Sequence, residues 1–330
     1  MDKNELNVPF PEGMTDEVTK LIDEYLFQAY PSTWNTIEKA CILLEHKNNK
    51  EVLLVPGSDY ALKLCYEALL NPGTGNVGLP DPTYAMNEVY AKIAGASITH
   101  FPYEKDLRLN QEAVFKSLSA LKMIVLANPN QPTGMLEKDS FILQLLEESH
   151  KNNVWVIIDE AYYSFSNYTA AAYVQEFDNL IITRSFSKSY GVAGLRIGAI
   201  ISCPKNIDYL SKALPVYCVN SIALRLLDVL VKYKPGFDKI HDEFVLQRAE
   251  IINYFNGIGC KCFNSDTNFV MVESNSVFDV GDYIRYLNGS DILIRGPWTK
   301  LPYMKAFRIS VSSKENIGKL KIVTNRFLNM

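Results

Sequence analysis

Short apolar runs alternate with amphipathic stretches from about residue 52 to residue 202. The apolar runs have the length of strands, and the stretches between them repeat apolar residues at helical spacing. We predict strands at 53–55, 77–79, 98–101, 123–127, 154–158, 180–183 and 197–201, separated by helices at 58–70, 85–94, 111–118 and 138–151. Wholly apolar strands that alternate with helices indicate a mostly parallel sheet covered by helices on both faces.

The pattern changes after Asn220. A long helical region is expected over 222–255, followed by strands near 268–272, 292–294 and 307–311 and a last helix at 314–328. This order predicts a second, smaller α/β domain, and the first residues lack a strand–helix unit of their own. We therefore expect an N-terminal arm that joins the small domain (1–35), a large domain (36–220) and a small C-terminal domain (221–330).

Composition narrows the class of protein without indicating a reaction. Apolar residues make up 48% of the 330 residues and charged residues 21%, which is typical of a soluble globular enzyme. The net charge of −4 gives no reason to expect nucleic acid or an anionic membrane as a partner. No window approaches the ~18 apolar residues of a membrane span, and the polar first 15 residues do not resemble a secretory signal. Six scattered cysteines indicate reduced thiols in the cytoplasm, and four histidines without an i, i+4 pair give no reason to expect a metal.

One lysine stands in a setting that suits covalent chemistry with an aldehyde cofactor. Small hydroxyl side chains and glycines flank it, in the run Arg184, Ser185, Phe186, Ser187, Lys188, Gly191, Gly194 and Arg196. A lysine that forms a Schiff base needs an accessible amine, small neighbouring side chains and a fixed cation that holds the cofactor's phosphate. Taken alone, the stretch fits an ordinary basic loop after a strand better than a cofactor site, and the other motifs decide between the two.

Polar residues stand at the carboxyl ends of three predicted strands: Asn128, Asp159 and Ser185. Ligands of open α/β sheets bind outside those ends. Asp159 closes a wholly apolar strand, so its carboxylate needs a partner such as a protonated pyridine nitrogen, unless it caps the following helix. Tyr162 is within reach of the ring's phenolic oxygen, or else packs among aromatic neighbours. Asn128 could donate to the same oxygen, although its loop of two prolines and a glycine also fits a rigid turn.

Two helix starts extend the set of candidates. Gly57, Ser58 and Asp59 follow a strand and open a helix, where free backbone N–H groups, the helix dipole and a hydroxyl favour an anion. A simple helix cap is the alternative. Tyr84 begins another helix and could either stack on a planar ring or pack beneath that helix.

Two arginines of the small domain, Arg295 and Arg308, lie 13 residues apart. Arg308 interrupts an apolar strand, which places it either at the surface or as a planar fork aimed at a carboxylate or phosphate. The pair suggests a substrate with an anionic group.

Together these residues resemble the fold-type I pyridoxal-phosphate aminotransferases of class I/II, with most likeness to histidinol-phosphate aminotransferase and threonine-phosphate decarboxylase. The likeness covers nearly the whole chain and depends on the order and spacing of segments 57–59, 82–84, 128–134, 159–162, 185–196 and 307–310. It implies a three-layer α/β/α large domain with a mostly parallel seven-stranded sheet, a small α/β domain, and pyridoxal 5′-phosphate as the cofactor.

The resemblance also implies the role of each residue around the cofactor ring. Lys188 is expected to bind the cofactor covalently and to carry the proton. Asp159 is expected to pair with the pyridine nitrogen, Tyr162 and Asn128 to bond the ring oxygen, and Tyr84 to stack on the ring.

The phosphate and the substrate have their own implied residues. Around the phosphate we expect Gly57, Ser58, Asp59, Ser185, Ser187 and Arg196, with Tyr30 reaching it from the partner subunit of a homodimer. Arg308 and Arg295 are expected to bind the acid group of the substrate. Two departures from the family concern the site: Tyr60 replaces a usual acidic residue, and the arm at 6–9, which helps to close the substrate pocket, is shortened.

The resemblance predicts amino transfer between an amino acid or phosphorylated amine and a 2-oxo acid. Decarboxylation of a phosphorylated amino acid is the alternative, because the ring serves both reactions and only the bond held perpendicular to it decides between them. A cofactor-binding protein without turnover is disfavoured, since such a protein would be expected to lose Lys188 or Asp159, and both are present.

Overall fold

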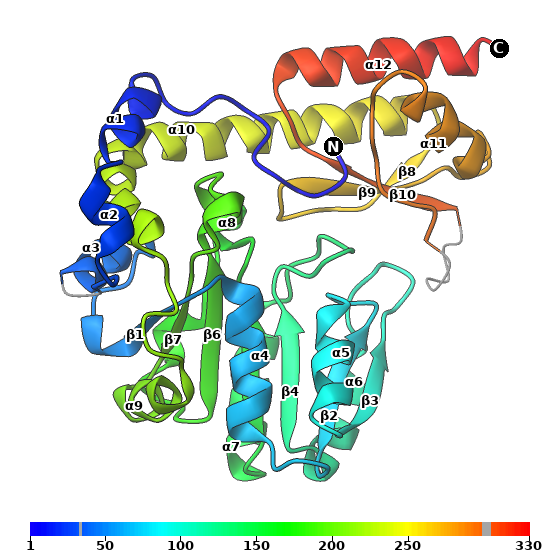
Figure 1. Ribbon diagram of the computed structural model, residues 1–330. Helices are drawn as coiled ribbons and strands as arrows, with labels where there is room; N and C mark the ends of the chain where they lie inside the picture. The colour runs from blue at the N-terminus through cyan, green and yellow to red at the C-terminus, as the bar shows by residue number, and fades with distance from the viewer. Residues whose placement is uncertain (33–34, 299–304) are drawn as a thin grey trace.

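Two β-sheets form the framework of the protein, and one long helix runs from the larger part to the smaller (Figure 1). The computed structural model describes residues 1–32, 35–298 and 305–330. The large sheet contains, in chain order, β1 (Val52–Val55), β2 (Asn76–Asp81), β3 (Ser97–Pro102), β4 (Met123–Ala127), β5 (Trp155–Asp159), β6 (Leu180–Ser185) and β7 (Gly198–Ser202).

The seven strands of the large sheet lie in the order β1-β7-β6-β5-β4-β2-β3. β3, β2, β4, β5 and β6 are parallel neighbours, whereas β7 runs antiparallel to both β6 and β1. The predicted mostly parallel seven-stranded sheet is therefore confirmed.

Helices cover both faces of this sheet because its strands are apolar on both sides. In β4, Met123 and Val125 enter a core beside α4 (Ser58–Leu69), α5 (Met86–Ile93) and α9 (Pro204–Ala213). Ile124 and Leu126 enter the opposite core, beside α3 (Thr36–Leu43), α6 (Gln111–Ser117) and α7 (Asp139–Lys151). Since successive side chains of a strand point to opposite faces, a strand that is buried throughout requires three layers.

The long helix α10 (Ser221–Gly257) contributes to two separate hydrophobic cores. One lies on the α3, α6 and α7 face of the large sheet, and the other lies in the smaller part of the protein. Leu230 and Phe237 pack in the core of the large sheet, as does Met14 of α1 (Met14–Lys20), which precedes α2 (Glu24–Gln28). Phe244 and Phe255 pack in a second core, which lies among the elements of the smaller part: β8 (Lys261–Cys262), β9 (Phe269–Glu273), β10 (Ala306–Ser310), α11 (Val280–Asn288) and α12 (Lys314–Leu328). The small sheet is antiparallel, in the order β10-β9-β8. The predicted domain boundaries at 35/36 and 220/221 stay predictions.

The hydrophobic pattern locates nearly all elements that it predicts to within about two residues, and the strand at 123–127 and the helix at 314–328 coincide with β4 and α12. The strand predicted at 292–294 is wrong. Arg295 forms only an isolated bridge with Arg308, because Gly296 and Pro297 follow and a proline has no N–H to donate to a ladder. Helices α1, α2, α3, α8 (Phe186–Ser189), α9 and α11 and the two-residue β8 were not predicted. Within the described residues, no helix is long and apolar enough to cross a membrane.

A glycine in β7 lets the start of α4 approach the sheet. A Cβ atom built on Gly198 would lie 2.5 Å from the backbone nitrogen of Ser58 and 2.8 Å from the carbonyl oxygen of Arg184. Both neighbours are backbone atoms, so neither can turn away. Gly198 therefore holds the first turn of α4 against the ends of β6 and β7.

We expect Gly198→Ala to reduce the free energy of unfolding by about 1–3 kcal/mol, because the added methyl group overlaps backbone on two sides. Urea unfolding of the cofactor-free protein measures this loss. Gly194→Ala is the matched control, since a Cβ at Gly194 meets nothing within 4 Å, and it should change stability by less than about 0.5 kcal/mol. Equal effects of the two substitutions would contradict this account of β7.

Candidate functional site

The polar residues at the strand ends lie side by side in the folded protein. Asp159 and Ser185 are the last residues of the neighbouring strands β5 and β6, and Asn128 directly follows β4. The backbone N–H of Asn128 donates to the carbonyl oxygen of Asp159 over 2.9 Å. The structure thus brings together three residues that are separated by up to 57 positions (185 − 128) in the sequence.

Asp159 is a buried carboxyl group with few partners, only 6% exposed. Thr183 donates its hydroxyl to Oδ1 over 2.8 Å, from the position in β6 that is paired with Asp159. Burial raises the pKa of Asp159 to about 7, against the opposing effect of the Thr183 hydrogen bond. A cation placed beside this carboxyl group would favour its ionised form.

Asn128 has an unused donor. Its Oδ1 accepts the backbone N–H of Glu137 over 2.8 Å, which orients the amide. Its Nδ2 is buried and has no hydrogen-bond partner among the residues that the structure describes. A buried donor without an acceptor is unfavourable, so this position suits a ligand that carries an oxygen atom.

Lys188 lies in the short helix α8 (Phe186–Ser189) and is half-buried. Burial lowers the pKa of its amine to about 8, and the guanidinium groups of Arg308 and Arg196 act in the same direction, against Glu5. Its Nζ donates to the carbonyl oxygen of Lys3 over 3.1 Å. A lysine with this pKa supplies a neutral, nucleophilic amine near neutral pH.

The first turn of α4 forms a cradle with Arg196. Gly57 precedes α4 with φ +89°, and a Cβ there would lie 2.9 Å from Nη2 of Arg196. The guanidinium therefore lies against the loop from which the free N–H groups of Ser58 and Asp59 begin the helix. Helix N-termini bind phosphate through such N–H groups and the helix dipole.

Two serines and a tyrosine extend this cradle. The Oγ of Ser185 accepts the backbone N–H of Ser187 over 3.1 Å, whereas the Oγ of Ser187 is buried and lacks a partner within the described part of the chain. Tyr84 donates its hydroxyl to Oδ1 of Asp59 over 3.1 Å. The Asp59 side chain is thereby engaged, so an anion here would meet its backbone.

Arg308 and Arg295 are cross-strand neighbours in the smaller part of the protein. Arg308 donates its backbone N–H to Arg295 over 2.7 Å and accepts from it over 3.1 Å. Arg308 is buried at 4% exposure, its guanidinium lies 5.1 Å from the ring centre of Phe269, and its Nη2 donates to the carbonyl oxygen of Asp2 over 2.6 Å. Its Nε has no partner among the described residues. Arg295 is exposed.

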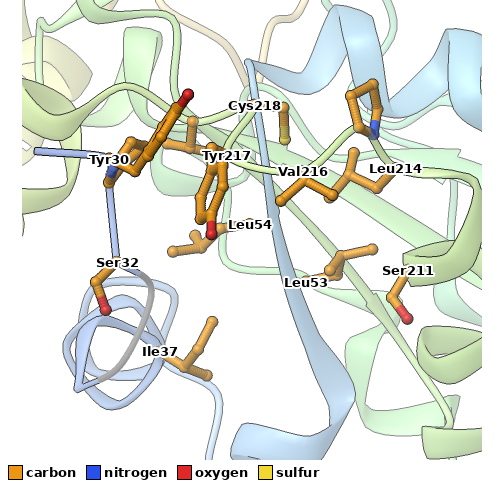
Figure 2. Close-up of a pocket in the computed structure, with 13 residues that line it drawn as sticks. Tyr30, Ser32, Ile37, Leu53, Leu54, Ser211, Leu214, Val216, Tyr217 and Cys218 are labelled. Carbon is orange, nitrogen blue, oxygen red and sulfur yellow. The ribbon is translucent and has the colours of Figure 1, made fainter.

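Tyr30 lies elsewhere on the chain. Its side chain is 80% exposed and stacks on Tyr217, with ring centres 4.7 Å apart. Figure 2 shows the two rings facing each other in a pocket of about 630 Å³, whose lining includes Leu54, Val216 and Cys218. Apart from Tyr30, no predicted cofactor residue lines this pocket. The expectation that Tyr30 serves a partner subunit stays a prediction.

Sequence reasoning missed three parts of the site. Thr183 was detectable in principle, because pairing the ends of β5 and β6 sets it beside Asp159. The other two had no local signal. They are the buried ion pair between Arg184 and Glu160, with 2.8 Å from Nη2 to Oε2, and the N-terminal residues that contact Lys188, Arg308 and Tyr162.

The groups described above fit pyridoxal 5′-phosphate. A buried carboxyl group matches a pyridinium nitrogen, the orphaned Asn128 amide matches the ring oxygen, and the cradle at α4 matches a phosphate. The lowered pKa of Lys188 suits an amine that reacts with an aldehyde. This fold and this set of side chains define a pyridoxal-phosphate-dependent enzyme of fold type I.

Comparison with known proteins gives the family. The family model "Aminotransferase class I and II" matches residues 16–321, and the chain belongs to that family. The histidinol-phosphate aminotransferase of Thermoanaerobacter pseudethanolicus is 32% identical over 96% of this chain and 89% of its own length. Two solved structures, each 19% identical, share the fold: histidinol-phosphate aminotransferase from Sinorhizobium meliloti in complex with pyridoxal-5′-phosphate (TM-score 0.88, 99% and 90% of the two chains) and L-threonine-O-3-phosphate decarboxylase from Porphyromonas gingivalis (TM-score 0.84, 100% and 99%). The protein is accordingly an aminotransferase that uses pyridoxal 5′-phosphate.

The raised pKa of Asp159 predicts how the stability of the cofactor-free protein depends on pH. The folded protein holds a proton that the unfolded chain releases near pH 4, so stability is lost as pH rises towards 7. Asp159→Asn removes this dependence, and the stability of wild type relative to this variant should fall by up to about 1.4 kcal/mol per pH unit. Urea unfolding from pH 4 to pH 8 measures the difference.

Asp208→Asn is the control for this experiment, because Asp208 is an exposed carboxylate in α9. It should leave the pH dependence of wild type unchanged. If wild type and Asp159→Asn lose stability in parallel across this range, Asp159 is not the group that titrates.

Proposed function

We propose that this protein transfers the amino group of a phosphorylated amine, of the histidinol phosphate class, to a 2-oxo acid. The observation that carries the proposal is the half-buried Lys188. Burial and the nearby charges of Arg308 and Arg196 lower the pKa of its amine to about 8. Relatives that cover 96% of the chain at about 30% identity are named histidinol-phosphate aminotransferase.

The proposed roles at the ring follow from the unsatisfied groups of the protein. Bound pyridoxal phosphate supplies an electron sink and an aldehyde carbon that accepts the amino group. Asp159 would keep the ring nitrogen protonated, because its buried carboxylate needs a cation beside it. The Nδ2 of Asn128 would donate to the ring oxygen, together with the hydroxyl of Tyr162, and Tyr84 would lie against the ring.

The phosphate would bind at the start of α4, which is the N-terminus of a 12-residue helix. The backbone N–H groups of Ser58 and Asp59 and the unpartnered hydroxyl of Ser187 are donors, and Arg196 supplies a positive charge. Gly57 and Ser185 shape the loop around these donors. Binding there would fix the phosphate end of the cofactor, and Lys188 would fix its aldehyde end.

Lys188 would act in two steps with the same atom. Its Nζ would hold the cofactor covalently and, once freed by the substrate amine, would act as a general base on the α-proton of the substrate and then as the general acid that hands this proton on. The lowered pKa keeps a large fraction of this amine neutral near pH 8, as a base requires.

The anion of the substrate would bind Arg308 and Arg295. Arg308 offers a guanidinium whose Nε is not used by the described residues and which lies 5.1 Å from the ring centre of Phe269. Arg295 presents a second guanidinium from the paired backbone position. Two guanidinium groups at paired backbone positions suit a phosphate, which offers more acceptor oxygens than a carboxylate.

The same pair of arginines supports the second candidate function, decarboxylation of a phosphorylated amino acid. Such a substrate carries a phosphate and a carboxylate, so each arginine could hold one of them. A structure named as a threonine-phosphate decarboxylase shares the fold over the whole chain. The outcome depends on which bond of the α-carbon stands perpendicular to the ring.

A homodimer and a cytoplasmic location complete the proposal. Tyr30, Val216 and Tyr217 are large apolar side chains that are more than half exposed around one pocket (Figure 2). An exposed apolar patch of this kind is typical of a protein–protein interface. A second copy of the chain would cover it and bring Tyr30 to the partner's phosphate.

Lys188→Ala is the direct test of the covalent role. We expect the variant to lose the visible absorbance that pyridoxal phosphate gains when it binds wild type covalently, and to lose turnover, because no amine remains at that position. Lys205→Ala, at an exposed lysine in α9, should retain both. Activity of the Lys188→Ala variant would refute the assigned role.

A substrate panel separates the two candidate reactions. Cofactor-loaded protein is mixed either with histidinol phosphate and a 2-oxo acid or with O-phosphothreonine, and both the carbonyl product and CO₂ are measured. We expect a carbonyl product from histidinol phosphate, conversion of the bound cofactor to its aminated form, and no CO₂ from phosphothreonine. Release of CO₂ at a higher kcat/KM would establish the decarboxylase instead.

A further inference from the structure

The first residues of the chain contact the functional side chains of the site one after another. Asp2 accepts from Arg308 and Lys3 accepts from Lys188 through their backbone carbonyl oxygens. Asn4 reaches Tyr162 with its side chain, donating from Nδ2 to the phenol oxygen over 2.9 Å. The N-terminal segment, residues 1–7, lies beside the small sheet, where Met1 accepts the backbone N–H of Ser310 in β10 (Figure 1).

Every polar group of Asn4, in the backbone and in the side chain, forms a hydrogen bond. It is 1% exposed and has φ +56°, a backbone conformation that asparagine tolerates better than most residues. Its N–H donates to the Oγ of Ser310 over 3.0 Å, and that hydroxyl donates back to Oδ1 of Asn4 over 2.8 Å. Asn268 donates to its carbonyl oxygen over 3.1 Å. Since Ser310 occupies Oδ1, the amide nitrogen is the end that faces Tyr162.

This contact decides where the proton of Tyr162 points. A phenol has one proton to donate, and its oxygen already accepts from Asn4. The proton therefore goes to another acceptor, which in this structure is Oε1 of Gln131 at 2.6 Å. The ring itself is held edge-on against Phe269, with centres 5.3 Å apart. Only the O–H bond has to rotate for the proton to reach a different oxygen.

We propose that Asn4 is a positioning residue for Tyr162, which fixes the phenol oxygen and commits its proton to the ring oxygen of the cofactor. The inference rests on the proposed function, in which Tyr162 lies beside that oxygen. A donor on the phenol oxygen also polarises the O–H bond and strengthens the bond that it donates. The N-terminal segment thus influences the electronic state of the cofactor indirectly, through Tyr162.

The charges around Tyr162 and Lys188 stay the same in the experiment that follows. Burial raises the pKa of Tyr162 to about 12, the Asn4 hydrogen bond and Arg308 act against it, and Asp159 acts with it. Lys188 is influenced by Arg308, Arg196 and Glu5. Removal of the Asn4 side chain changes none of these charges.

The measured quantity is the pH midpoint of the visible absorbance change of the cofactor-loaded protein. A hydrogen bond donated to the ring oxygen withdraws negative charge from it and so lowers the proton affinity of the nearby nitrogen that joins the cofactor to Lys188. Tyr162→Phe should therefore raise the midpoint. Asn4→Gly keeps the positive φ accessible. It should raise the midpoint by about 0.5 pH unit, because the loss of the Asn4 contact weakens the Tyr162 hydrogen bond without removing it.

A double-mutant cycle separates positioning from a general structural effect. In the Tyr162→Phe background, Asn4→Gly should add no further shift, because its route to the cofactor is gone. Asn153→Gly makes the same substitution at an exposed asparagine that also has a positive φ, +53°, and should leave the midpoint unchanged. Asn4→Ser, which is also uncharged and also removes the amide, serves if the glycine variant does not fold, and its upward shift should likewise be absent in the Tyr162→Phe background.

The outcomes distinguish this inference from the proposed function. If Tyr162→Phe shifts the midpoint and Asn4→Gly does not, or if the Asn4 shift persists in full without the Tyr162 hydroxyl, the inference alone is overturned. A wild-type protein that takes up no pyridoxal phosphate would overturn the proposed function and this inference with it.

Discussion

The buried carboxyl group of Asp159 imposes the strongest constraint on the site. It ends a strand whose last four residues are all buried, and among the side chains that the structure describes only Thr183 forms a hydrogen bond to it. An isolated carboxylate in such a place is unfavourable, so it either holds a proton or meets a cation. Two other groups of the site are in a similar state. The Nδ2 of Asn128 is buried without a partner among the described residues, and burial of the Lys188 amine disfavours its charged form.

Periodicity alone was sufficient for the large sheet, because strands buried on both faces are wholly apolar and β4 ends where its apolar run ends. It was insufficient at 292–294, where the apolar residues are followed by Gly296 and Pro297 and only one pair of residues bridges to Arg308. The strand-end residues could be predicted, since the carboxyl ends of parallel strands meet at one edge. The contacts of Asp2, Lys3 and Asn4 could not, because they join positions up to 306 residues apart and no local pattern encodes them.

The site is divided between two hydrophobic cores. Lys188 and Asp159 stand on the large sheet, whereas Arg308 belongs to β10 of the small sheet, packed among the residues of the second core. The N-terminal segment crosses from one to the other and bonds to Lys188 and to Arg308 through adjacent carbonyl oxygens. Nζ of Lys188 and Nη2 of Arg308 each donate a hydrogen bond in this way, which limits the penalty of keeping two cations close together in a partly buried place.

The helix α10 is common to both cores, and at 37 residues it extends about 55 Å. Phe237 is held by the large sheet and Phe244 by the small one, and Pro235, just before them, removes one backbone hydrogen bond from the helix. The distance between Lys188 on the large sheet and Arg308 on the small sheet therefore depends on the curvature of this one helix. Under the proposed function, the length of substrate that fits between them would be set in part by a helix on which none of the candidate residues lies.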